Sequence, residues 1–206
     1  MKNRLLNALL SDLTANDIWR IDFLYSVTHD CSFERSLFMP SLTPQQLAEI
    51  PTLLPILIDW GERMEKRALS EGIAVNDILR NAATILRIKD IGAVRILAVP
   101  SICEPENQRI VALAAALGLS FSNLGGITFG HGILVHCSCA QDNALLTHEL
   151  VHVRQYEQAG TIARYLPVYV QQLIQYGYQN MPLEREAVIE TANMWPPPPH
   201  RPVEQR

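Results

Sequence analysis

Apolar residues in the first 90 positions recur every three or four residues, which is the spacing of amphipathic helices. The clearest case is the segment 76–88, whose apolar side chains gather on one face. Thr43-Pro44 combines a capping residue with a proline suited to a first helical turn, and a longer helix is expected from Pro55 to Ser70. Residues 1–10 favour an amphipathic helix over a signal peptide, because their apolar run is short. We therefore predict a helical N-terminal region over residues 1–90, packed on the rest of the chain.

The pattern changes after residue 90, where short apolar runs alternate with helical segments. Strands are predicted over 93–99, 126–129 and 133–136, the last two being separate strands or one bent strand. Helices are predicted from Glu104-Pro105-Glu106 to Gly118, after a cap at Asp142 or Asn143, over about 161–178, and over 182–194. This order predicts an α+β fold with its core over residues 91–195 and a Pro-rich tail over 196–206.

Composition narrows the class of protein without identifying it. With 206 residues, of which 48% are apolar, the chain can bury a sizeable core. Its 17 basic and 21 acidic residues form no basic cluster, so we expect no nucleic-acid partner. No apolar stretch approaches the roughly 20 residues of a membrane span. The four cysteines are scattered, which favours reduced thiols and a cytoplasmic protein over a disulfide framework.

The segment His148-Glu149-Leu150-Val151-His152, within an uninterrupted helix-forming run, carries the candidate chemistry. Residues four apart lie on one helix face, so both imidazoles can approach one ion to about 2 Å. Glu149 lies about 100° round the helix, where it can accept a proton from a water on the metal. Core hydrogen bonding of the histidines is the alternative, but buried imidazoles and a carboxylate need partners that a metal supplies. We predict Zn²⁺ bound by His148 and His152, with Glu149 as catalytic base.

Residues 146–156, which contain this motif, resemble the active-site helix of the zincin metallopeptidases. The resemblance takes in a preceding strand and a following glutamate helix, and so covers about residues 90–195. It implies a zincin-like core, made of a small sheet, an active-site helix and a glutamate helix. It also implies that residues 126–136 supply the edge strand to which a peptide or protein substrate adds as a further strand.

A catalytic zinc needs a third protein ligand and an open position for water. The metzincin pattern would place glycine and histidine where this chain has Gln155 and Gln158, so that branch is excluded. No aspartate follows Asp142, which excludes the branch with a downstream aspartate ligand. His131 and His136 precede the motif and are expected to be hydrogen-bonded wall residues rather than ligands.

The last predicted helix resembles the Glu-x-x-Ala segment of the glutamate zincins, or gluzincins. The resemblance implies that Glu184 is the third zinc ligand and that Ala187 is the small residue that permits close helix packing. These proteins commonly have an acidic residue four positions after the ligand, where this chain has Val188. A shift by two would make Glu186 the ligand and Glu190 the supporting acid, so both assignments stay open.

The residues thus predict a zinc-dependent metallopeptidase that hydrolyses peptide bonds. The alternative is a non-catalytic zinc-binding module that acts as a regulatory or partner-binding protein. A site closed by four protein ligands would favour that alternative, because no position for water would remain. The sequence indicates neither the particular substrate nor the oligomeric state.

Overall fold

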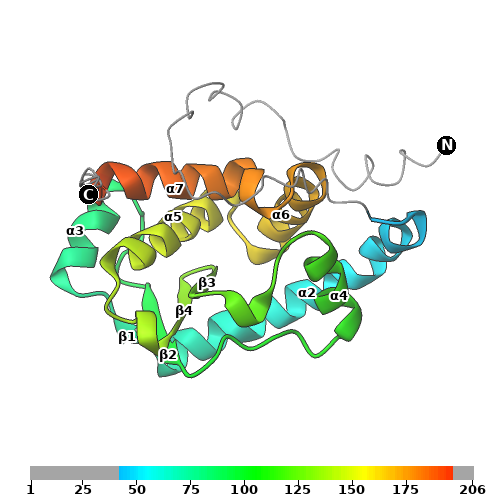
Figure 1. Ribbon diagram of the computed structural model, residues 1–206. Coiled ribbons are helices and arrows are strands. Elements are labelled where there is room, and N and C mark those ends of the chain that lie inside the picture. Colours follow the sequence, from blue (N-terminus) through cyan, green and yellow to red (C-terminus); the bar gives the residue numbers. More distant parts are fainter. Residues whose placement is uncertain (1–41, 197–206) are drawn as a thin grey trace, which may run out of the picture. The chain divides into compact units, whose positions relative to one another are not determined.

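The computed structural model describes residues 42–196 of the chain. This part of the chain contains six α-helices and a small four-stranded mixed sheet (Figure 1). The predicted α+β class is therefore confirmed. The helix predicted over residues 1–10 and the tail from residue 197 onward lie outside the described residues.

The longest helix, α2 (Pro44–Glu71), begins at the predicted cap. Thr43 Oγ1 accepts a hydrogen bond from the Gln46 amide, and the Gln46 side chain accepts one from the Thr43 amide. The prediction of a separate helix beginning at Pro55 is wrong, because Pro51 and Pro55 both lie inside α2. Both prolines are exposed, and so is Leu47, so water can reach the residues whose carbonyl groups lose a helical donor.

The sheet has the strand order β1-β2-β4-β3. Its strands are β1 (Ile73–Ala74), β2 (Arg95–Val99), β3 (Gly126–Phe129) and β4 (Gly132–His136). The central pair, β2 and β4, is parallel, with Arg95 opposite Gly132. β3 and β4 form an antiparallel hairpin, which confirms two strands rather than one bent strand. β3 is consequently the strand at one edge of the sheet.

The remaining helices agree with the predicted order. They are α3 (Asp77–Ile85), α4 (Gln108–Ala116), α5 (Asn143–Ala159), α6 (Ile162–Tyr176) and α7 (Pro182–Met194). Asp142 caps α5 as expected. α4 begins later than predicted, because Asn107 is its cap and Glu106 forms an ion pair with Arg63 of α2. None of the helices within residues 42–196 is long and apolar enough to cross a lipid bilayer.

The two faces of the sheet are buried against different helices (Figure 1). Ile133 and Val135 of β4 pack in a cluster with apolar residues of α3 and α5, whereas Leu134 packs with residues of α2 and α6. The alternation along β4 places α5 on one face and α2 on the other. α7 in turn packs along α5. Helix α5, which carries the motif, is thereby held between the sheet and α7.

Candidate metal centre

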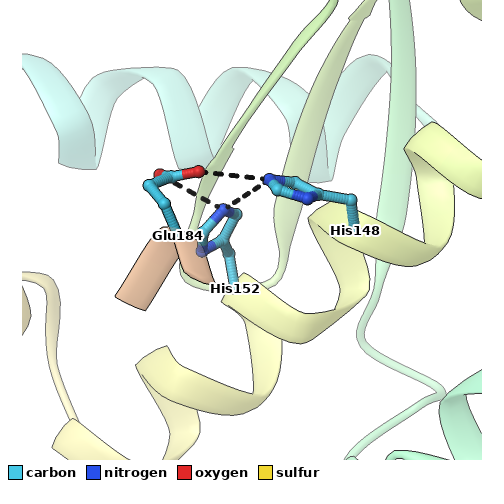
Figure 2. A group of neighbouring side chains, drawn as sticks. All are labelled: His148, His152 and Glu184. Atoms are coloured by element: carbon cyan, nitrogen blue, oxygen red, sulfur yellow. Dashed lines mark hydrogen bonds and ion pairs between the residues drawn. The ribbon is translucent and has the colours of Figure 1, made fainter. Parts of the chain in front are cut away.

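Three side chains from two helices converge at one point: His148 and His152 of α5 and Glu184 of α7. Figure 2 shows the two imidazole rings and the carboxylate directed toward one another. The two Nε2 atoms lie 3.1 Å apart. Glu184 Oε2 lies 3.3 Å from His148 Nε2, and Oε1 lies 3.5 Å from His152 Nε2. His152 and Glu184 are buried and His148 is half-buried, so the group is largely shielded from solvent.

These separations fit the coordination of zinc. Two ligand atoms that are each about 2.05 Å from a zinc ion and subtend the tetrahedral angle lie about 3.3 Å apart. The three nearest contacts, between 3.1 and 3.5 Å, lie close to that value, with a different Glu184 oxygen facing each histidine. Two imidazoles and one carboxylate are also a donor set found in catalytic zinc sites. The residues present therefore fit a zinc ion with one position left for another ligand.

Gln155 fixes the orientation of the His152 ring. His152 Nδ1 lies 2.8 Å from Gln155 Oε1. The Gln155 amide nitrogen donates to the Leu183 carbonyl and to Glu186 Oε2, so its oxygen faces the histidine and accepts the proton of Nδ1. A neutral His152 then has its lone pair on Nε2, the atom that faces His148 and Glu184. This contact prepares His152 to act as a ligand.

Glu184 and Glu186, the two candidates for the third ligand, have different surroundings. Glu184 meets the histidines, whereas Glu186 Oε1 accepts a hydrogen bond from Arg154 at 2.8 Å. Glu190 also pairs with Arg154, at 3.3 Å. Val188, at the position where an acid was expected by resemblance, is 54% exposed. The structure thus brings Glu184 into the cluster and directs Glu186 and Glu190 to a separate ion-pair network.

Glu149 lies beside the cluster rather than within it, as its position on the helix predicted. Thr128 Oγ1 of β3 donates to Glu149 Oε2 at 2.7 Å, and Glu149 is only 4% exposed. A Cβ atom at Gly126 would lie 2.7 Å from Glu149 Oε1, so only glycine leaves room for this carboxylate position. Glu149 lines the same cavity as His148, His152 and Glu184. A carboxylate is therefore available next to the candidate metal centre.

Burial and the charge of the neighbouring group shift the pKa values of His152 and Glu184 in opposite directions. Burial by itself lowers the pKa of His152, but the nearby Glu184 carboxylate outweighs it and raises this pKa to about 9. Burial by itself raises the pKa of Glu184, but His152 and His148 outweigh it and hold this pKa well below the usual carboxyl range. In the metal-free protein the two groups therefore form an imidazolium–carboxylate pair near neutral pH.

This pair predicts how the stability of the metal-free protein depends on pH. Between the ordinary histidine pKa of 6.5 and about 9, the folded state binds more protons than the unfolded state. The free energy of unfolding should therefore fall with rising pH in this window, by up to about 1.4 kcal/mol per pH unit. Urea unfolding of chelator-treated protein at pH 6 to 9 measures this slope. His152→Gln should flatten it, and an equally steep slope in that variant would contradict the assignment.

The other histidines near the motif form hydrogen bonds away from the cluster, as expected. His131 Nε2 lies 3.0 Å from Glu157 Oε1, and His136 Nδ1 lies 2.6 Å from Ser138 Oγ. Sequence reasoning missed the contribution of Gln155, although its position three residues after His152 places it on the same side of the helix. It also assigned no particular role to Tyr169, whose hydroxyl donates to Glu184 Oε1 at 3.0 Å.

The chain was compared with protein-family models, with curated proteins and with solved structures, and none of them matches it. Similarity to a known protein therefore assigns no function to the chain. The functional proposal rests on the motif and on the arrangement of His148, His152 and Glu184.

Proposed function

We propose that this protein is a zinc-dependent metallopeptidase of the gluzincin type, with His148, His152 and Glu184 as the zinc ligands. The observation that carries the proposal is the convergence of two imidazole nitrogens and one carboxylate, whose nearest contacts of 3.1 to 3.5 Å suit groups around a tetrahedral zinc. The neighbouring Glu149 carboxylate supports a catalytic role over a purely structural one, because it adds a proton acceptor beside the ligands.

The zinc ion and Glu149 would have different roles in hydrolysis. Zinc held in such a site lowers the pKa of a water molecule and polarises the carbonyl group of a peptide bond. Glu149 would accept the proton released by the attacking water and deliver it to the leaving amine. The hydrogen bond from Thr128 holds one carboxylate oxygen of Glu149 and leaves the other to exchange the proton.

The arrangement of elements around the cluster supports the zincin assignment. In this proposal α5 is the active-site helix, α7 is the glutamate helix and β3 is the strand beside the cleft. Within residues 42–196, β3 pairs with β4 along one edge only. A peptide substrate would add as a strand along its other edge, close to Glu149.

A non-catalytic zinc module is the second candidate, and a closed site of four protein ligands would favour it. In the part of the chain that the structure describes, the converging group has three members. Three protein ligands leave room for a water molecule, which favours the peptidase.

Metal analysis combined with a hydrolysis assay tests the proposed function. The purified full-length chain should bind about one equivalent of zinc, measured by elemental analysis, and should cleave an unfolded protein such as reduced casein. Chelation should stop cleavage and added zinc should restore it. Protein without bound metal after incubation with zinc would overturn the proposal, whereas bound zinc without cleavage would support the non-catalytic module.

Replacement of Gln155 by leucine should weaken zinc binding by about 10- to 100-fold, the usual effect of losing a hydrogen bond that orients a metal-binding histidine. The His152 Nδ1 proton would lose its acceptor, so the ring would no longer be held with Nε2 toward the ion. Competition with a chromophoric chelator at fixed pH measures the zinc affinity.

The matched control for this prediction is Gln158→Leu. Gln158 lies on the same helix, and its side chain is exposed. This variant should keep the zinc affinity of the parent protein. Equal affinities of all three proteins would contradict the orienting role of Gln155, provided that both variants are folded by circular dichroism.

A further inference from the structure

An apolar cavity is lined by residues of α2, α4, α5, α6 and β3. The groups of the candidate site, His148, Glu149, His152 and Glu184, are among these residues. The rest of the wall is almost wholly apolar, and includes Leu53, Trp60, Ala114, Phe121, Phe129 and Leu173. Among the wall residues within the described part of the chain, charged groups come only from the candidate site. The cavity thus combines the polar groups of the candidate site with an otherwise apolar wall.

The size of the cavity indicates what it can hold. Its volume is about 140 Å³. An engineered apolar cavity of about 150 Å³ in another protein binds benzene, so this volume suits one aromatic ring or one large aliphatic side chain. An apolar pocket of this size with a few converging polar groups is the usual form of a small-molecule or side-chain binding site.

The walls of the cavity are firmly packed. Trp60 lies edge-on to Phe121 and to Phe129, with ring centroids 5.6 and 5.0 Å apart. All three side chains are at most 4% exposed. Such interlocked rings keep the cavity from collapsing when it is empty. A charged side chain placed among the apolar wall residues, away from the cluster, would lose its hydration without gaining a partner, so these walls favour apolar groups.

We propose that this cavity is the specificity pocket of the enzyme and binds a bulky apolar side chain, of the size of leucine or phenylalanine, next to the cleaved bond. This inference rests on the proposed peptidase function. A peptide that adds along β3 presents successive side chains to opposite faces of the sheet. One side chain would then enter the cavity while the neighbouring carbonyl group lies at the cluster.

The first test measures the cavity without metal. Toluene should bind metal-free protein with a dissociation constant on the order of 1 mM, measured by NMR titration. Ala114→Phe, which places a ring inside the cavity, should weaken this binding at least about tenfold. The matched control Ala115→Phe places the same ring on the exposed side of α4 and should bind toluene like the parent. Leu113→Trp, at a half-buried wall position, replaces Ala114→Phe if that variant does not fold.

The second test uses zinc-loaded protein and two hydroxamates. Acetohydroxamate carries only the metal-binding group, whereas 3-phenylpropanohydroxamate adds a ring. The second compound should bind roughly 10- to 100-fold more tightly, which corresponds to the burial of one large apolar group. Filling the cavity through Ala114→Phe should remove this advantage and leave acetohydroxamate binding unchanged. Ala115→Phe should keep the advantage.

The outcomes separate this inference from the proposed function. Zinc binding with equal affinities for the two hydroxamates, and no binding of toluene, would overturn the pocket and leave the metallopeptidase standing. Toluene binding that Ala114→Phe removes, in a protein that does not bind zinc, would overturn the proposed function and with it the role of the cavity in substrate selection. The ring-dependent advantage and its loss in Ala114→Phe together support the pocket.

Discussion

Glu149→Gln is expected to lower the rate of peptide hydrolysis by at least about 100-fold while the protein still binds one equivalent of zinc. A positioned general base contributes roughly 10²- to 10⁴-fold to such reactions, and the amide of glutamine cannot accept the proton. The substitution preserves shape and volume, and its carbonyl oxygen can still accept the hydrogen bond from Thr128. The proposed zinc ligands and their separations should therefore be unaffected. Zinc content and initial rates, measured on the same preparation, check both halves of the prediction.

Glu157→Gln is the matched control, since Glu157 lies on the same helix as Glu149. Its carboxylate accepts hydrogen bonds from the backbone of Lys89 and Asp90 and from His131, away from the cluster. This variant should lose some stability but keep both zinc and hydrolysis. Full hydrolytic activity in Glu149→Gln would overturn the assigned base. Loss of zinc in that variant would show that Glu149 supports the metal rather than the proton transfer.

The candidate site was largely predictable where it depends on one helix. The features that position these groups all lie within a single segment of chain: the cap at Asp142, the apolar positions of α5, and the four-residue spacing of His148 and His152. Local hydrogen bonding and helix geometry therefore determine how these groups face one another. The same geometry places Glu149 off the ligand face, where the structure has it.

The third member of the cluster could not be predicted in this way. Residues two positions apart on a helix point about 200° from each other, so only one of Glu184 and Glu186 can face the histidines. Which of them does so depends on how α7 packs along α5, and that packing involves residues distant in sequence. The resemblance places a supporting acid four positions after the ligand, where this chain has Val188, whereas the contact that orients His152 comes from Gln155 of α5.

In the sheet, too, local sequence determines some features and long-range packing determines others. Apolar runs predicted three of the strands, yet periodicity does not specify which strands pair, and the parallel pairing of β2 with β4 follows from the crossover through α4. β1 has only two residues, too few for a pattern. The error at Pro55 has a different cause, because burial on one face of α2 outweighs the local cost of an exposed proline.

Under the proposed function, substrate selectivity would also depend on residues before position 91. The resemblance to zincins covers about residues 90–195, but α2 supplies Leu53 and Trp60 to the cavity wall. The helical segment before residue 91 therefore contributes to the surface next to the cluster. Substrate preference would thus depend on a part of the chain outside the resemblance.

The acid that completes the proposed zinc site can be identified by comparing Glu184→Gln with Glu186→Gln. Glu184→Gln should weaken zinc binding by more than about 100-fold, beyond the usual effect of a lost supporting hydrogen bond, because it removes an anionic ligand. Glu186→Gln should weaken it by less than about tenfold. Glu186 contacts Arg154 and Gln155, so its loss reaches the ion only through the orientation of His152.

The two substitutions are matched in chemistry and lie on the same helix, so a general effect on α7 would appear in both. Zinc affinity from chelator competition, with thermal unfolding of the metal-free variants as a check of folding, gives the comparison. A larger loss in Glu186→Gln would move the ligand to Glu186 and require α7 to turn from the observed orientation. Equal and small losses would mean that neither acid binds the ion, which would leave two histidines, too few to hold a catalytic zinc, and would remove the basis for the peptidase.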